Sequence, residues 1–457
     1  MNDRPWAVVG GGAAGLAAAE ALLSGGRRVV LLERRPQLGG RVCSFRDPGT
    51  GWLLENGQHI WMPACTEWAA LLERTGTESL TRTQPRLRVA YLERGHPPAV
   101  LEAARLPGPL GLLMALLRFP PLTPAERRRL LRGLFALRRE GPRLRRTGGD
   151  ERFSDWLDRH GQTGRVRDLF WAPVVLSVLN TPLEEARADL AAMAVHEPFL
   201  TGPGRANLVR TVVPHGRLWE RLAAHLTGRG LVLRTGCPVR GLRLGETAAG
   251  PVLDALLLPG DEVLEVAGAV IAVPPEALTA ILPPAWRERP PFTVGRGLTW
   301  SPILNVHLWL DRAVTGEEAL CLIGSPVQWI FTRPTQQAEG GGVRLPAGAQ
   351  HLDLVVSASD KWLDHTPAEI VPCFSEELRA LLPKAREAVL LAHRVVHERR
   401  ATWRALPGSE AHRPGPATPI RNLALAGAWT ASGWPATIEG AVRSGRAAVR
   451  ALGVQPG

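Results

Sequence analysis

The order of apolar and polar residues near the N-terminus predicts a strand, a helix and a second strand. The apolar run Ala7–Val9 predicts a short buried strand, and Ala13–Leu23 has the composition of a buried helix. Gly25 and Gly26 mark the end of that helix, and Val29–Leu32 follows as the next strand. Such a strand–helix–strand unit is typical of a parallel sheet covered by helices, so the chain is predicted to be α/β.

Similar patterns return in the second half of the chain. A helix is predicted from Pro214 to about Leu226. Strands are predicted at 231–233, 239–242, 269–273, 298–310 and 351–357. The last two alternate apolar and polar residues, as in Leu304–Leu308, which is typical of an antiparallel sheet.

These elements predict two domains, each assembled from separate parts of the chain. A length of 457 residues is enough to bury a large core and to form two domains. We expect a Rossmann-type domain from 1–84, 205–290 and 400–457. A second domain, with a mixed or antiparallel sheet and helices, is expected from 85–204 and 291–399.

The pattern changes between residues 105 and 146. Leu106–Leu122 is apolar but contains four prolines. A basic amphipathic helix is then predicted near 124–140, with Leu130, Leu134 and Leu137 on one side and arginines mostly on the other. Two interpretations stay open at this point: a surface helix docked on the protein's own core, or a contact with a membrane surface.

Composition and charge exclude several classes of partner and site. The net charge of +12 comes almost entirely from arginine, because Lys361 and Lys384 are the only lysines. No aromatic–basic pattern accompanies this charge, so no nucleic-acid partner is expected. The five cysteines are scattered and include no CxxC pair, so neither a disulfide framework nor a metal site is expected.

The termini and the hydropathy bear on location. The N-terminus leads directly into a strand, without a charged leader and an apolar core of a signal peptide. No run of about 20 apolar residues is present that would span a bilayer. We therefore expect a cytoplasmic protein, either soluble or peripheral on the inner face of the cell membrane.

A Gly-x-Gly-x-x-Gly motif joins the first strand to the first helix. Gly10 allows the tight turn, Gly12 lets the backbone approach a phosphate, and Gly15 lets the helix pack on the strand. The N-terminal N–H groups of the helix then face a pyrophosphate. Glu33 ends the next strand and can accept hydrogen bonds from an adenosine ribose. The motif therefore predicts a dinucleotide site.

Two further motifs follow the second predicted strand. Gly39, Gly40 and Arg41 are either an ordinary turn or a second contact with the pyrophosphate, from glycine backbone and a guanidinium. The five residues 55–59, with the sequence Glu-Asn-Gly-Gln-His, form a polar segment between apolar stretches. We call this segment the polar knot.

A C-terminal motif predicts the other end of the same cofactor site. Leu425–Trp429 reads as a strand and a loop, and a new helix is expected to begin with Pro435. The N–H groups of Ala436–Ile438 would then point at the flavin C2 carbonyl, where negative charge gathers on reduction. Trp429 and Trp434 are either core residues or walls of the isoalloxazine site. Together with the N-terminal motif, this pattern predicts FAD bound along its whole length.

These residues resemble the flavin amine oxidase and carotenoid desaturase superfamily, from end to end of the chain. Within it, the polar knot and the segment Gly433–Gly445 look most like the hydroxysqualene dehydroxylase family, also called squalene-associated FAD-dependent desaturase. The resemblance implies removal of an allylic hydroxyl from hydroxysqualene to give squalene for hopanoid synthesis. One residue departs from the family pattern: an acid that bonds a ribityl hydroxyl is replaced by Ala428, so weaker FAD binding is expected.

The motifs and the resemblance together give the expected cofactor-binding residues. These are Gly10, Gly12, Ala13, Ala14, Gly15, Glu33, Arg34, Gly39, Gly40, Arg41, Gly57, Gln58, His59, Val239, Gly427, Trp429, Pro435, Ala436, Thr437 and Ile438. No second dinucleotide motif is visible, so two sources of electrons stay open: NADPH bound only transiently, or another protein that reduces the flavin.

Dehydroxylation needs a proton donor, a nonpolar cavity for a cation-like centre, and a hydride from the reduced flavin. His59 is the first candidate for the donor because it lies in the polar knot, although it could equally fix that loop. Glu55 is the second candidate. The expected partners are an isoprenoid lipid, a membrane surface and upstream enzymes of squalene synthesis. The alternatives are a carotenoid-type desaturase or isomerase, another amine-oxidase-like oxidoreductase, or a flavin-free scaffold of an isoprenoid assembly.

Overall fold

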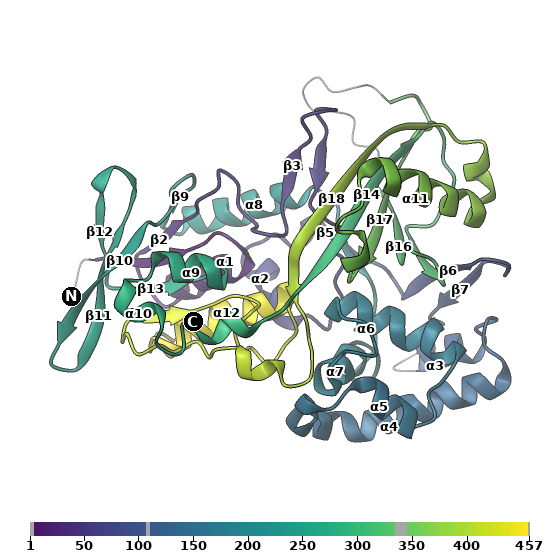
Figure 1. Cartoon of the computed structure of the whole chain (residues 1–457), viewed down its shortest axis with the longest axis horizontal. Coiled ribbons are helices and arrows are strands. Elements are labelled where there is room, and N and C mark those ends of the chain that lie inside the picture. Colours follow the sequence, from purple (N-terminus) through teal and green to yellow (C-terminus); the bar gives the residue numbers. More distant parts are fainter. Residues whose placement is uncertain (1–3, 107–109, 334–344, 456–457) are drawn as a thin grey trace.

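The computed structural model describes residues 4–106, 110–333 and 345–455 (Figure 1). One part of the structure is built on a five-stranded parallel sheet with the strand order β19-β13-β1-β2-β9. The strands are β1 (Trp6–Val9), β2 (Val29–Leu32), β9 (Leu231–Arg234), β13 (Gly268–Ile271) and β19 (Leu423–Leu425). Segments from both ends of the chain are therefore neighbours in one sheet.

Side chains alternate along these short strands, so successive residues pack on opposite faces of the sheet. Val8, Leu31 and Val270 pack with four helices on one face. These helices are α1 (Ala13–Ser24), α2 (Thr66–Arg74), α8 (His215–Gly228) and α12 (Ile438–Ala451). Ala7 and Val9 face the other way. Residues from α9 (Pro275–Ile281) and from the antiparallel sheet β10 (Gly241–Thr247), β11 (Gly250–Leu257) and β12 (Val263–Glu265) join them in a second core.

The other part of the structure contains a seven-stranded sheet with the order β18-β14-β17-β16-β15-β6-β7. Neighbouring strands are antiparallel except for β15 and β6, so the sheet is mixed. The strands are β6 (Arg88–Glu93), β7 (Ala99–Glu102), β14 (Trp300–Leu310), β15 (Ala319–Ile323), β16 (Trp329–Arg333), β17 (Gln350–Ser357) and β18 (Leu390–Trp403). β14 and β18 are long and run back toward the parallel sheet (Figure 1).

The two faces of this sheet differ in chemistry. Leu304, Val306 and Leu308 of β14 pack with apolar residues of α11 (Pro367–Leu381). Asn305 and His307 alternate with them and are also buried, so they occupy the opposite face. One face is therefore an ordinary core, and the other buries polar side chains.

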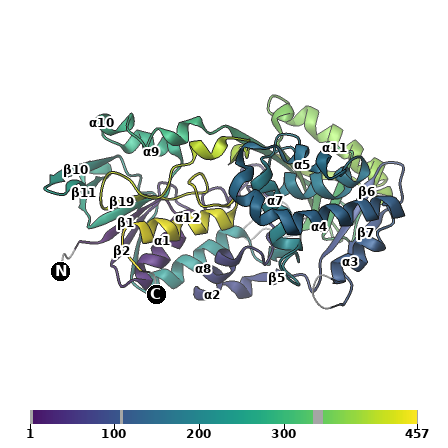
Figure 2. The same ribbon diagram turned by 90° about the horizontal axis from the view of Figure 1, so that it is seen from below.

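A helical layer lies beside this sheet and below it in Figure 1, and Figure 2 shows the layer from underneath. It comprises α3 (Leu110–Leu117), α4 (Pro124–Thr147), α5 (Phe153–Arg159), a π-helix (Arg167–Trp171), α6 (Ala172–Leu179) and α7 (Ala188–Phe199). α4 continues through Pro142, beyond the predicted end near residue 140. Its last turns pack on α7, where a Cβ on Gly141 would lie 3.0 Å from the His196 ring.

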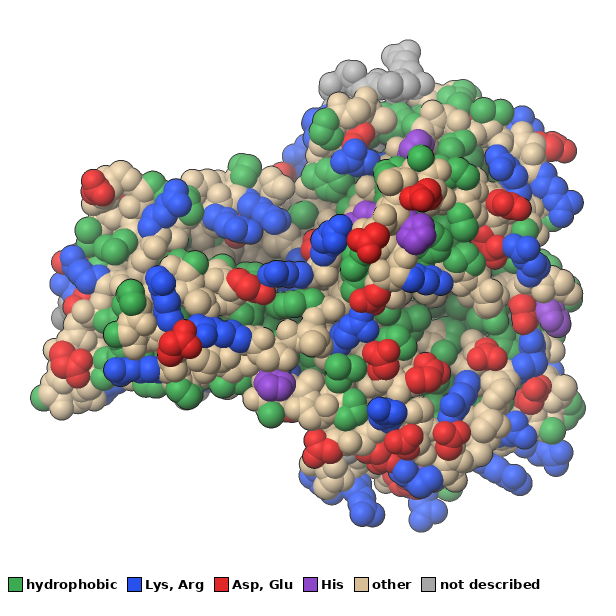
Figure 3. Space-filling model, in the orientation of Figure 1, with side chains coloured by type: hydrophobic (Ala, Val, Ile, Leu, Met, Phe, Trp, Pro, Cys, Tyr) green, Lys and Arg blue, Asp and Glu red, His purple; other side chains and the backbone are tan. Residues whose placement is uncertain are grey.

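The apolar side of α4 faces inward. Leu130 and Leu137 are fully buried and Leu134 is 6% exposed, because all three belong to the protein's own core. Of the two interpretations, docking on the protein's own core therefore holds for these leucines, and their burial in a membrane surface is wrong. Phe135, by contrast, is 62% exposed. Arginines of the basic side stand out along the lower right edge of Figure 3.

Short elements complete the described part of the chain. They are β3 (Ser44–Arg46) paired with β4 (Leu53–Glu55), β5 (Thr81–Thr83) paired with β8 (Val209–Thr211), and α10 (Pro284–Arg287). Within residues 4–106, 110–333 and 345–455, no helix is long and apolar enough to cross a membrane. Pro107 and Pro109, part of the proline-interrupted run, lie outside the described residues. The predicted fold class is confirmed, with a Rossmann-type sheet from several segments and a second, mixed sheet with helices.

Candidate active site

The glycine turn after β1 has the geometry expected of a dinucleotide cradle. Gly10 has a φ of +108°, and a Cβ there would lie 2.5 Å from the carbonyl oxygen of Ala272. A Cβ on Gly15 would lie 1.9 Å from the Gly10 carbonyl oxygen, so the helix packs directly on the turn. At Gly12 the nearest atom to such a Cβ is 3.9 Å away. The turn is therefore closed toward the sheet and open at Gly12, where α1 begins with Ala13.

The acid at the end of β2 lies against this turn. The Glu33 carboxylate is buried and accepts a hydrogen bond of 2.6 Å from the Gly11 N–H. Its backbone carbonyl accepts from the Cys237 N–H at 2.9 Å, which brings the segment containing Val239 alongside. The Arg34 side chain is exposed. Glu33, the residue expected to bind the ribose, therefore contacts the first glycine turn through its carboxylate and the segment that contains Val239 through its backbone carbonyl.

A second glycine turn faces the first. The Gly39 N–H donates to the Gly11 carbonyl at 2.9 Å. Gly40 has a φ of +62°, and a Cβ there would lie 3.5 Å from the Gly12 Cα. Because Gly12 and Gly40 carry no side chains, the two backbones can approach each other closely and leave their outer side open to a pyrophosphate.

Arg41 contacts the strand β18, and its expected contact with the pyrophosphate stays a prediction. Its guanidinium donates to the Ala401 carbonyl at 2.7 Å, so it ties the second glycine turn to β18. Burial lowers its pKa, against the attraction of Glu398 and Glu276. Asn56 reinforces this link, because its amide donates to the Arg41 carbonyl and to the Glu398 carboxylate, each at 3.0 Å.

The C-terminal motif lies at the carboxyl ends of β13 and β19. Gly427 has a φ of +138°, and its N–H donates to the Ser444 hydroxyl at 2.8 Å. The Trp429 indole N–H donates to the Val273 carbonyl at 3.0 Å, and this side chain is only 3% exposed. Trp429 is therefore a core residue that fixes the loop after β19.

The start of the last helix differs from the prediction. α12 begins at Ile438, and the Thr437 hydroxyl caps it by accepting from the Gly440 N–H at 3.2 Å. Pro435 lies in the loop before the cap, so the prediction that it is the first helical residue is wrong. The Thr437 N–H donates to the Pro435 carbonyl at 2.7 Å. Of the three N–H groups expected to point at the flavin, that of Thr437 is therefore occupied. The N–H groups of Ile438 and Glu439, at the first two helical positions, have no intrahelical acceptor.

Glu439 has a structural role that was not predicted from the sequence. Its side chain is fully buried and accepts from the Glu67 and Trp68 N–H groups at the start of α2, at 3.1 and 2.7 Å. Arg443 pairs with it at 2.7 Å. Burial raises its pKa, although these donors oppose the shift. This carboxylate therefore anchors the N-terminus of α12 to that of α2.

The residues present fit FAD. The two glycine turns, Glu33 and the start of α12 all lie at the carboxyl edge of one parallel sheet, where α/β proteins bind dinucleotides. A dinucleotide across this edge would meet the open backbone at Gly12 and Gly40 and the N-terminus of α12. Ala428, where the resemblance implies an acid, is 4% exposed, and its carbonyl accepts from the Trp403 indole at 2.9 Å.

Both carboxylate oxygens of Glu55, the second candidate for the proton donor, accept hydrogen bonds. Its carboxylate accepts from the His215 ring Nδ1 at 2.6 Å, the Ser44 hydroxyl at 2.9 Å and the His215 N–H at 3.1 Å. Burial alone would raise its pKa, but His215 and Arg333 together hold that pKa at about 2. Glu55 is therefore ionised at neutral pH and cannot deliver a proton, which corrects its expected catalytic role. The sequence predictions missed His215 as its partner.

His59, the first candidate, is also a poor acid. Its Nδ1 lies 2.9 Å from the Gly57 carbonyl, so Nδ1 carries the proton and Nε2 does not. Burial and the neighbouring His215 ring, 5.2 Å away edge to face, lower the His59 pKa to about 3. The ring is therefore neutral at physiological pH, and its bond to Gly57 fixes the loop, as the alternative interpretation expected.

The polar knot packs against the polar face of the seven-stranded sheet. The Asn305 amide donates to the Asn56 carbonyl at 3.0 Å, and a Cβ on Gly57 would lie 3.0 Å from the Asn305 side chain. Arg333 donates to the Gln58 side chain. The alternation around Asn305 was visible in the sequence, but its contact with the knot was not.

Buried titratable groups continue along this face. His307 Nε2 lies 3.2 Å from the Glu55 carbonyl, and its Nδ1 lies 3.2 Å from His351 Nε2. Because a carbonyl only accepts, His307 is protonated on Nε2 and accepts from His351. Burial lowers the pKa of both rings. The fully buried Asp353 pairs with Arg333 at 3.4 Å.

A cavity of about 420 Å³ lies beside the polar knot and this face. Its apolar lining includes Trp52, Ile60, Leu208, Trp309 and Phe331, and its polar lining includes Glu55, Gln58, Arg86, Arg88, Arg210, Arg333 and His351. The expected cavity was nonpolar, whereas this one combines aromatic walls with charged groups.

Similarity to known proteins agrees with this arrangement. The chain is 31% identical to a hydroxysqualene dehydroxylase from Rhodopseudomonas palustris, over 96% of each chain. It is 26% identical to a 15-cis-phytoene desaturase from Synechococcus elongatus, over 93% of this chain and 90% of that protein. A solved structure of a putrescine oxidase double mutant has a TM-score of 0.73 at 19% identity, over 98% of this chain and 99% of that one, so it shares the fold.

A family model described as flavin containing amine oxidoreductase matches residues 13–453. The match begins with α1, directly after the first glycine turn, and spans the second glycine turn, the polar knot and the start of α12. The flavin-free scaffold is therefore set aside. The chain belongs to the family of flavin containing amine oxidoreductases and is an FAD-dependent oxidoreductase.

Proposed function

We propose that this chain catalyses the FAD-dependent reductive removal of the allylic hydroxyl of hydroxysqualene to give squalene, for hopanoid or other isoprenoid synthesis. The observation that carries the proposal is similarity along the whole chain to two proteins named hydroxysqualene dehydroxylase. They are 31% and 30% identical to it, and each alignment covers more than nine-tenths of both proteins.

In this reaction the C–O bond breaks, the oxygen leaves as water after gaining a proton, and the same carbon receives a hydride. Reduced FAD, when bound, supplies the hydride. The protein has to supply the proton and hold the apolar chain. NADPH is our proposed source of the electrons, and upstream enzymes of squalene synthesis are the proposed suppliers of the substrate.

The proposed proton donor is His215, oriented by Glu55. Its Nδ1 is held by the carboxylate at 2.6 Å, and its Nε2 is buried without a hydrogen-bond partner in the described part of the chain. A histidine held in this way by an acid has one fixed nitrogen and one available for proton transfer. His59, with its lowered pKa, is better suited to orienting the substrate hydroxyl than to protonating it.

The proposed substrate cavity is the one beside the polar knot. Trp52, Trp309 and Phe331 give it apolar walls, and Glu55 and Gln58 link it to the cofactor side. Electron-rich aromatic faces stabilise a cation-like carbon, which the departure of a hydroxyl creates.

Anaerobic incubation of the reduced enzyme with hydroxysqualene, followed by mass analysis of the product, tests the proposal. Squalene is expected, with stoichiometric oxidation of the flavin. His215→Asn should retain FAD and lose most of the product, and His225→Asn, on the same helix, is the matched control. A reduced enzyme that leaves hydroxysqualene unchanged contradicts the proposal.

A second candidate function is desaturation or isomerisation of a carotenoid-type polyene. It is favoured by the 26% identity to a 15-cis-phytoene desaturase over most of both chains. The oxidised enzyme is the relevant form here, so incubation of oxidised enzyme with phytoene separates the two. Formation of a further conjugated double bond, with no squalene from the reduced enzyme, would favour this candidate.

We also propose that the protein works at a membrane surface, since its substrate dissolves in lipid. The buried leucines of α4 cannot supply the contact, but other apolar residues of the helical layer are exposed. Leu110 and Leu117 of α3 are 48% and 39% exposed, and Phe135 of α4 is 62% exposed. The arginines on the outer side of α4 add attraction to anionic lipid headgroups.

A further inference from the structure

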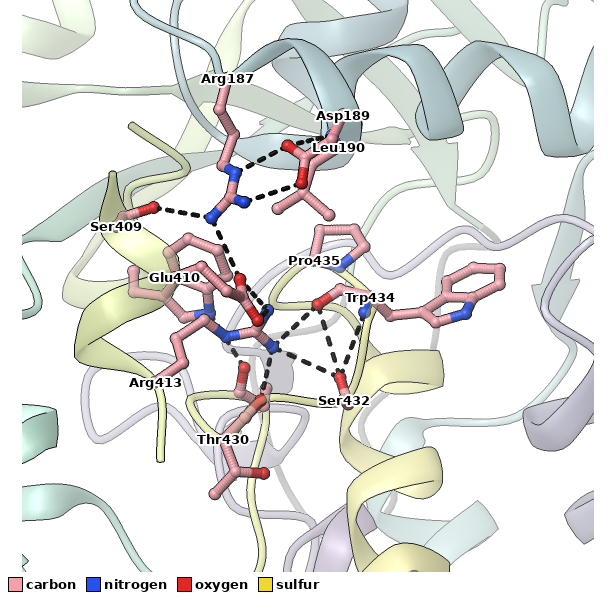
Figure 4. Close-up of polar contacts among 12 residues, drawn as sticks. Arg187, Asp189, Leu190, Ser409, Glu410, Arg413, Thr430, Ser432, Trp434 and Pro435 are labelled. Atoms are coloured by element: carbon pink, nitrogen blue, oxygen red, sulfur yellow. Dashed lines mark hydrogen bonds and ion pairs between the residues drawn. The ribbon is translucent and has the colours of Figure 1, made fainter. Parts of the chain in front are cut away.

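A buried arginine holds the loop between β19 and α12. Arg413 has a fully buried side chain, and one guanidinium nitrogen donates to the Thr430 carbonyl at 2.5 Å and to the Trp434 carbonyl at 2.9 Å (Figure 4). The same nitrogen lies 3.3 Å from the Ser432 hydroxyl. Three points of one short loop therefore converge on a single side chain.

The second terminal nitrogen and the face of the Arg413 guanidinium also have partners. Its second terminal nitrogen donates to the Glu410 carboxylate at 3.0 Å, and the guanidinium lies 4.5 Å from the Trp403 ring centroid. Trp403 in turn donates to the Ala428 carbonyl at 2.9 Å. The loop is thus held at residues 428, 430, 432 and 434 by a two-residue unit of Trp403 and Arg413.

Glu410 connects this unit to the helical layer. Its carboxylate also accepts from Arg187 at 3.0 Å, and Arg187 pairs through two nitrogens with Asp189 at the start of α7, each at 2.7 Å (Figure 4). Arg187 is 3% exposed. Two buried arginines and two acids therefore join α7 to the loop.

The position of this loop matters because it precedes the N-terminus of α12, which fits the flavin end of FAD. Unlike Glu439, which anchors the helix to α2, Arg413 contacts the loop directly. We propose that Arg413 is the positioning residue of the FAD site: it sets the course of residues 428–434 and so the placement of the α12 N-terminus against the cofactor. The proposal rests on FAD binding and is independent of the identity of the substrate.

Arginine is required because the contacts need a planar fork. A lysine ammonium is a point charge that cannot reach two carbonyls, a carboxylate and a ring face at once. Burial lowers the pKa of Arg413, against the attraction of Glu410. A lysine there would retain charge but lose most of these bonds, and an unpartnered buried charge or carbonyl is costly.

The test is equilibrium titration of the apoprotein with FAD, followed by flavin fluorescence and visible absorbance. Arg413→Lys and Arg413→Ala are expected to weaken FAD binding about 10- to 150-fold, the range for losing a charge-assisted hydrogen bond. The absorbance of the flavin that still binds should shift, because the loop no longer fixes its surroundings. Added guanidinium ion should restore affinity to Arg413→Ala, because it fills the vacated site.

Arg187→Lys is the matched control, since Arg187 belongs to the same network but does not contact the loop. It should change FAD affinity by less than about threefold while lowering the apoprotein melting temperature by a similar amount to Arg413→Lys. Equal loss of FAD affinity in both variants, or unchanged affinity in a folded Arg413→Ala, would overturn the proposal. Absence of squalene formation by a wild type that binds FAD would refute the proposed reaction and leave this inference intact.

Discussion

Gly445 of α12 lies directly against the Ala14 carbonyl of α1: a Cβ on Gly445 would be 2.2 Å from that oxygen. This contact joins two motifs that are more than 400 residues apart in the sequence. Both helices begin at the cofactor edge of the parallel sheet, so their close packing places the two ends of the FAD site relative to one another.

Gly445→Ala should therefore damage both stability and cofactor binding. The added methyl has to separate α1 from α12, and overpacking of this kind costs about 1–3 kcal/mol. Chemical denaturation and FAD titration measure the two effects. Gly228→Ala is the matched control, because nothing lies within 4 Å of a Cβ at that end of α8. If Gly445→Ala behaves like the control, the helices do not pack as described.

Ala428→Asp should tighten FAD binding. The resemblance described above implies an acid at this position that bonds a ribityl hydroxyl, and a charged hydrogen bond contributes about 1.5–3 kcal/mol, or roughly 10- to 150-fold in affinity. The measurement is the dissociation constant of FAD with the apoprotein. Ala428→Asn has nearly the same size without the charge and should give a smaller gain. An unchanged constant in both variants would mean that the ribityl chain does not reach this residue.

Stability should fall as the pH decreases below about 6.5. Burial lowers the pKa of His59 from 6.5 to about 3 and lowers those of His307 and His351 in the same direction. The unfolded chain therefore binds protons at pH values where the folded protein does not, and the free energy of unfolding decreases with falling pH. Urea denaturation at a series of pH values measures this slope.

His59→Gln should flatten that slope between about pH 6.5 and pH 4, because one neutral buried ring is gone. The exposed His393 offers the control, His393→Gln. A separate loss is expected at lower pH: the Glu55 pKa of about 2 lies below the ordinary 4.5, so its contribution is complete above 4.5 and is lost as the pH falls toward 2. A pH-independent stability between 7 and 4 would contradict the described burial.

Vesicle flotation tests the membrane proposal. Leu110→Ser with Leu117→Ser should reduce binding to anionic vesicles while FAD stays bound, because both residues are exposed. Leu130→Ser, by contrast, should destabilise the fold, since burying a polar group in place of a fully buried leucine costs several kcal/mol, about 2–5. Flotation of the Leu110/Leu117 variant equal to that of the wild type would contradict the proposed contact surface.

The strands and the turn at the start of the parallel sheet were predicted well, because these elements depend on residues that are close together in the sequence. The apolar run before Gly10, the three glycines and Glu33 fix a strand, a turn and an acid within one short unit, and the structure brings them together as expected. The alternation in Leu304–Leu308 likewise predicted a strand with two different faces. The division into domains at the stated residues stays a prediction, although the strands of the five-stranded sheet come from the expected ranges.

Predictions that depended on which neighbour a side chain meets were less successful. Pro435 is chemically suited to a helix start, but Thr437 provides the cap, because its hydroxyl reaches the Gly440 N–H. The leucines of α4 suit a membrane as well as a core, and only packing against α7 decided between them.

What the sequence determined by itself was the cofactor cradle and the family, because a dinucleotide site is built from backbone turns whose glycines have to be local in sequence. What only the tertiary structure decided was the electrostatics of the reaction side. His215 lies 160 residues from Glu55, yet their contact fixes the charge of the carboxylate and leaves one ring nitrogen available. The pKa of a buried group is set by its neighbours in space, and no pattern along the chain names them.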